Sequence, residues 1–147
     1  MVFKIIIVLL ASLLFFDLSQ HNDKTSLLCH TWKQVYFKSF NGTLSKDLSK
    51  EMSKICNFNI NGDYEEEMYN LKSGGKWYFN DEKTKFGILL NSFNGKPLPV
   101  LNDTYKRTNI IILKLNQDTL IYGHETYYGY GPNKVFGHDE WCFVRVK

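Results

Sequence analysis

The chain has 147 residues, a length that suits one domain and can bury a hydrophobic core without metal ions or disulfides. With 44% hydrophobic and 22% charged residues, the composition excludes an intrinsically disordered chain. The net charge is only +3 and the lysines are scattered among acidic residues, so we expect no nucleic-acid partner.

The first twenty residues differ in kind from the rest. Lys4 precedes a run from Ile5 to Phe16 that is apolar except for Ser12, and the chain turns polar at His21. This order is typical of a secretory signal peptide, and the run is shorter than the ~20 residues that a membrane-spanning helix needs. We therefore expect a signal peptide over 1–20 and an exported domain over 21–147, periplasmic or extracellular and not membrane-spanning.

The rest of the chain reads as short strands between turn signals, in keeping with its 16% of aromatic residues. Asn61-Gly62 predicts a type I′ hairpin, and Ser73-Gly74-Gly75 predicts a break before the next strand. A weak helical repeat from Leu44 to Ile55 indicates either a short helix or a polar loop. Pro97 and Pro99 place their segment at an edge or in a loop. The predicted strands cover 31–38, 55–60, 63–70, 76–79, 85–91, 109–115, 119–127 and 140–147, with a loop over 129–137.

These eight strands are joined mostly by hairpin-length turns, and no crossover helices separate them. The pattern predicts an all-β fold, either an antiparallel up-and-down barrel or a sandwich. In a barrel the last strand would pair with the first, which removes the exposed sheet edges.

Four motifs carry a resemblance to a known family. They are Leu27-Leu28-Cys29-His30-Thr31-Trp32, with His30 where the family has Gly, then Phe58 to Tyr64, Gly75-Lys76-Trp77, and Leu113 to Leu120. Over about 27–147 the chain resembles lipocalin-like (calycin) domains, in particular the small ones of bacterial envelope proteins. The resemblance implies an eight-stranded barrel with a central cavity that holds a small hydrophobic molecule, and it implies no catalytic residues.

In such a barrel, alternate side chains point inward. Strand parity nominates seven interior residues as ligand-binding candidates, namely Phe58, Met68, Trp77, Phe79, Leu89, Ile111 and Leu113. The alternative is that they simply fill the core. Trp32 is expected to plug the closed end, with its indole N–H needing one partner.

Two clusters combine histidine with acidic residues. His124-Glu125 and His138-Asp139-Glu140 could hold zinc if a hairpin joined them, but the spacing matches no recognised ligand motif. We expect solvated loop residues instead, with no metal, no cofactor and no enzymatic activity.

A Tyr-rich loop over 122–141 has the composition of a binding surface. Its candidate interaction residues are Tyr127, Tyr128, Tyr130 and Phe136, and the alternative is a long hairpin packed on itself. The leading functional hypothesis is a binder or carrier of a small apolar ligand. The other is a protein-interaction or envelope-assembly module, in which this loop contacts an envelope protein partner.

Three cysteines allow at most one intrachain disulfide. Because barrel closure brings the first and last strands together, a Cys29–Cys142 bridge is the expected pair. Cys56 would then remain a buried thiol.

Overall fold

The computed structural model describes residues 24–45, 53–99, 106–129 and 131–147. The predicted signal peptide lies outside these residues, as does most of the 44–55 segment, whose first two residues form a short strand. Within the described ranges, no helix is long and apolar enough to cross a membrane.

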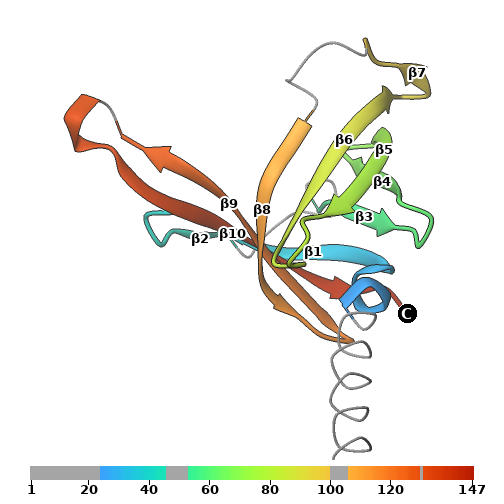
Figure 1. Ribbon diagram of the computed structural model, residues 1–147, viewed down its shortest axis with the longest axis horizontal. Helices are drawn as coiled ribbons and strands as arrows, with labels where there is room; N and C mark the ends of the chain where they lie inside the picture. The colour runs from blue at the N-terminus through green and yellow to red at the C-terminus, as the bar shows by residue number, and fades with distance from the viewer. Residues whose placement is uncertain (1–23, 46–52, 100–105, 130) are drawn as a thin grey trace, which may run out of the picture.

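In the described residues, ten strands form one antiparallel sheet (Figure 1). Their order is β10-β9-β8-β6-β5-β4-β3-β1, and β10 pairs with β1, so these eight close into an up-and-down barrel. The two-residue strands β2 and β7 pair with β1 and β6. The bounds are β1 Thr31–Lys38, β2 Leu44–Ser45, β3 Ile55–Phe58, β4 Asp63–Met68, β5 Leu71–Phe79, β6 Lys85–Phe93, β7 Lys96–Pro97, β8 Lys106–Leu115, β9 Thr119–Tyr128 and β10 Val135–Arg145.

The predicted all-β barrel is therefore confirmed, and β1 has the predicted bounds. The hairpin at Asn61-Gly62 is also confirmed, since β3 and β4 pair across it. Its predicted turn type was wrong, because a type I′ turn needs positive φ at both central residues. Here Gly62 has a φ of 85° and Asn61 does not have a positive φ.

The predicted break at Ser73-Gly74-Gly75 was wrong, since β5 runs through it with a bulge between Gly74 and Gly75. A Cβ atom on Gly75 would lie 2.1 Å from the carbonyl oxygen of Leu89. The glycine therefore permits a close approach of β5 to β6 and does not interrupt the strand.

The barrel is packed solid at one end. Trp32 is fully buried there, and its indole N–H donates to the carbonyl oxygen of Leu28 at 2.9 Å, as the plug prediction required. Residues 24–28 form the helical turn that carries Leu28, drawn in blue near the C-terminus in Figure 1. Phe58 contacts the rings of Tyr64, Trp77 and Phe86. The other fully buried large side chains include Phe143 and Leu120.

All three cysteines are free, so the predicted Cys29–Cys142 bridge was wrong. The pairing of β1 with β10 sets Cys142 opposite Tyr36. Tyr36 lies five residues beyond the start of β1, roughly 16 Å along a strand, whereas Cys29 precedes that start. The distance exceeds what a disulfide spans. Cys56 is a buried thiol.

The close contact at Gly75 gives a testable consequence. Gly75→Ala should destabilise the domain by about 1–3 kcal/mol, because the added methyl group meets backbone atoms that cannot move without shifting β6. Chemical denaturation measures the effect. Gly74→Ala is the matched control, since its Cβ would meet mainly the Ser92 hydroxyl, which can rotate away. Equal losses in the two variants would contradict this account of the bulge.

Candidate ligand-binding site

A cavity of about 430 Å³ lies inside the barrel, away from the end that Trp32 plugs. Its volume falls within the range of small-molecule sites, about 300–1,000 Å³. It combines apolar walls with ionised groups. The lining residues are Lys54, Glu66, Met68, Ile88, Arg107, Ile110, Tyr122, His124, Asp139 and Trp141.

The strand register places these side chains on the inner face. Paired residues in an antiparallel sheet share a face, and β6 and β8 pair Ile88 with Arg107. Across the next two strand pairs, Ile110 faces His124 and His124 faces Asp139. On β4, Glu66 and Met68 follow the buried Tyr64 at every second position. The cavity is thus lined from most of the barrel wall.

A buried carboxylate joins two cationic groups in this cavity. The Nη1 and Nη2 atoms of Arg107 donate to the two oxygens of Glu66, both at 2.6 Å. Lys54 Nζ lies 2.5 Å from Glu66 Oε2, which also accepts the Tyr64 hydroxyl at 2.7 Å. The side chains of Lys54 and Glu66 are 8% and 9% exposed, whereas that of Arg107 is 38% exposed. We call Lys54, Glu66 and Arg107 the buried triad.

The triad is fully ionised at neutral pH. Burial alone would raise the pKa of Glu66, but the bonds from Arg107 and the charge of Lys54 outweigh it and hold that pKa at about 2. Burial also opposes the charge on Lys54, but nearby acidic groups outweigh it and raise the pKa of Lys54 above its ordinary value. Of these acidic groups, Glu66 is the one that is ionised at neutral pH. Burial also raises the pKa of Tyr122 to about 12, which keeps this neighbouring hydroxyl neutral.

The predicted interior residues divide into three groups. Phe58, Trp77 and Phe79 pack in or against the solid core, and Met68 lines the cavity. Leu89 and Leu113 are each 41% exposed and belong neither to the cavity wall nor to the core cluster, so their predicted inward orientation was wrong. Ile111 is half-buried but belongs neither to the cavity wall nor to the core cluster.

The errors on β6 and β8 have a physical cause. On β6 the buried face carries Phe86 and Ile88, which is the opposite phase to Leu89. On β8, Asn109 has a φ of 58° and the pairing with β9 shifts between Ile112 and Lys114. Each irregularity adds a residue to the alternation, so the inward positions shift from those that a strict period of two predicts.

The triad was missed by the sequence reasoning because charged residues are usually placed outside. A signal was present in the run Glu65-Glu66-Glu67, since alternation in a strand must turn the middle carboxylate away from the other two. Arg107 precedes the predicted start of its strand at 109. In the structure β8 begins at Lys106, so Arg107 lies in the barrel wall.

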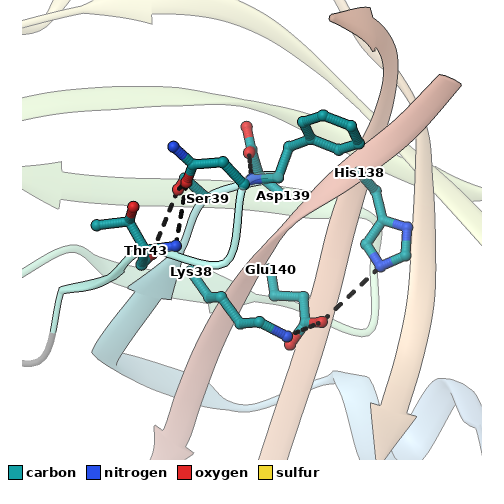
Figure 2. A network of polar contacts seen from close by, with 8 residues as sticks. Lys38, Ser39, Thr43, His138, Asp139 and Glu140 are labelled. Atoms are coloured by element: carbon teal, nitrogen blue, oxygen red, sulfur yellow. Dashed lines mark hydrogen bonds and ion pairs between the residues drawn. The ribbon is translucent and has the colours of Figure 1, made fainter. Parts of the chain in front are cut away.

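The second histidine cluster has a structural role. Figure 2 shows the turn after β1 held against β10, where the backbone N–H of Phe40 donates to Asp139 Oδ1 at 2.8 Å. Lys38 pairs with Glu140 at 3.0 Å, and His138 Nε2 lies 4.0 Å from the same carboxylate. His124 lines the cavity, whereas the side chain of His138 lies beside Gly123 on the other face. Among the described residues, no cluster suited to a metal ion occurs.

The Tyr-rich segment is a hairpin of β9 and β10 and not a long loop. The last strand, β10, begins at Val135, five residues before the predicted start at 140. In Figure 1 this hairpin extends well beyond the barrel. Tyr127 and Phe136 are 66% and 56% exposed and contact each other. Tyr128 is half-buried and stacks on Phe40, 4.2 Å between ring centroids. Tyr130 lies outside the described residues.

No protein-family model matches this chain, and no curated protein matches it by sequence. Its function is therefore inferred from the barrel, the cavity and the chemistry of the residues that line it.

Glu66 provides a test of this site. Glu66→Gln should destabilise the domain by about 3–5 kcal/mol at neutral pH, because it leaves the buried Lys54 and the partly exposed Arg107 without a carboxylate. Glu65→Gln is the matched control, because that neighbouring side chain is exposed, and its change should stay within about 0.5 kcal/mol.

The pKa of Glu66 also predicts how the free energy of unfolding falls at acid pH. The pKa of Glu66 is about 2 in the folded protein against an ordinary value of 4.5, so its stabilisation is present above pH 4.5 and is lost as pH falls towards 2. In denaturation experiments across this range, the free energy of unfolding of the parent protein should fall by about 3 kcal/mol because Glu66 becomes protonated. An equally steep acid limb in Glu66→Gln would contradict this assignment.

Proposed function

We propose that this protein binds and carries a small apolar ligand inside its barrel and that it is not an enzyme. The observation that carries this proposal is the cavity of about 430 Å³ beside the solid end of the barrel. Met68, Ile88 and Ile110 provide apolar surface, and Trp141 adds an aromatic wall. A concave apolar site with a few converging polar groups is the usual form of a small-molecule site.

We also propose membership of the lipocalin-like domains and export from the cell. In support of the first, the Trp32 motif opens β1 at the plugged end, and the Phe58–Tyr64 motif forms the β3–β4 hairpin. The support for export is the pattern of residues 1–20. Amino-terminal sequencing of the mature protein tests export, since a chain that still began at Met1 would contradict it.

A pair of substitutions tests whether ligands enter the barrel. Met68 and Leu89 are 40% and 41% exposed, but Met68 lines the cavity and Leu89 does not. If the cavity is the site, Met68→Trp should fill part of it and weaken binding of the neutral fluorophore Nile red by about tenfold, or ~1.4 kcal/mol. Leu89→Trp adds the same bulk outside and should leave the affinity unchanged.

Native mass spectrometry of the protein purified from its own host complements this titration, because a retained ligand adds mass. Equal affinities of the two Trp variants for Nile red would show that the dye binds elsewhere. Failure of the parent protein to bind any apolar probe would contradict the carrier function.

A second candidate function is protein recognition by the end of the β9–β10 hairpin, with an envelope protein as the candidate partner. The specific observation is that Tyr127, Val135 and Phe136 are each more than half exposed on an extension of the barrel. Exposed aromatic side chains are the commonest anchors of protein interfaces.

Stability measurements test whether these aromatic residues are available to a partner. Tyr127→Ala should change the free energy of unfolding by no more than about 0.5 kcal/mol, since the side chain is two-thirds exposed. Tyr128→Ala, the adjacent control, should cost about 1–3 kcal/mol because it removes the stacking partner of Phe40. Unfolding of the Tyr127 variant would show that this residue belongs to the core.

A further inference from the structure

We propose that the ligand of the barrel carries an anionic head group, a carboxylate on an alkyl chain, and that Arg107 binds it. This inference rests on the proposed carrier function and specifies the chemical class of its ligand. It follows from the charge, exposure and donor geometry of the buried triad.

The triad has an unbalanced charge. Lys54 and Arg107 each carry one positive charge, and both contact a single carboxylate, that of Glu66. The sum over the triad is one excess positive charge; Asp139 also lines the cavity, so this excess is local to the triad and is not a net charge of the whole wall. A cation in such a site is costly unless it is paired, so an anion that enters the cavity would gain more than a neutral molecule of the same shape.

The exposed fractions of the two cationic side chains indicate which of them a ligand can reach. The Lys54 side chain is only 8% exposed and lies against Glu66, so a ligand has little access to it. Arg107 is 38% exposed and lines the cavity. A guanidinium has five N–H donors, and Glu66 accepts from two of them. The remaining donors can take the paired oxygens of a ligand carboxylate.

The cavity also contains a second acid, Asp139, which could favour a cationic ligand instead. Its Oδ1 already accepts the backbone N–H of Phe40 at 2.8 Å, and its strand pairing sets it opposite His124. Asp139 therefore has a donor of its own, whereas Arg107 lines the cavity together with apolar residues. Arg107 is paired with Ile88 across β6 and β8, and Met68 and Ile110 line the same cavity. This arrangement suits an anion with an alkyl tail.

Three ligands with the same alkyl chain test the proposal: decanoate, decanol and decylamine, each used to displace Nile red from the full mature protein. Decanoate should bind at least about tenfold more tightly than decanol, as expected for a hydrogen-bonded charge. Decylamine should bind most weakly. In Arg107→Met the advantage of decanoate should disappear while the affinity for decanol stays the same.

Lys114→Met is the matched control, because it removes one positive charge from the exposed face of the same strand. It should leave the preference for decanoate intact. In Arg107→Met, Glu66 keeps its contacts with Lys54 and Tyr64, which favours correct folding. Arg107→Lys serves as the second variant, and it should bind decanoate less tightly than the parent because an ammonium lacks the planar fork.

The outcomes separate the two proposals. Displacement by all three ligands with equal affinity, or a preference for decylamine, would overturn the anionic ligand and leave the carrier function standing. A preference for decanoate that persists in both Arg107 variants would overturn the assignment to Arg107. If neither Nile red nor any of the three ligands binds the parent protein, the carrier function itself fails.

Discussion

One buried carboxylate governs the interior of this barrel. Glu66 on β4 contacts Lys54, which precedes β3, and Arg107 on β8, so it joins opposite parts of the wall through the interior. Each bond is charge-assisted, and removal of Glu66 would leave both Lys54 and Arg107 without a carboxylate partner. The packed aromatic end and the hollow end therefore meet at a polar boundary that joins β4 and β8 to the residue preceding β3.

This boundary accounts for where the barrel is hollow. Below it, Phe58 contacts the rings of Tyr64, Trp77 and Phe86, and these side chains fill the space between the walls. At the level of the triad, water or a ligand must solvate ionised groups, and apolar packing cannot continue. Folding thus retains a cavity where the sequence places charge, at the cost of the stability that a larger apolar core would supply.

The sequence was sufficient for the fold, because alternation, turn residues and strand spacing are local features. Strand β1 and the hairpin at Gly62 followed from them directly. The site was less accessible. The bulges around Asn109 and Ile112 alter which residues of β8 face inward, and they depend on pairing with β6 and β9. The partnership of Glu66 with Arg107 joins residues far apart in the chain, so neither residue alone indicates that it is buried.

The pairing of β1 with β10 has a consequence for how the protein is made. It sets Trp32 opposite Arg145, so almost the entire domain must leave the ribosome before the barrel can close. The neighbouring strand pairs from β1 to β9 can form earlier from shorter-range contacts, but closure carries the entropy cost of the longest loop in the molecule. Until then β1 and β9 present open edges, the form in which strands pair with other chains. A stop codon before β10 would leave those edges exposed permanently, so a truncated product should be prone to aggregation.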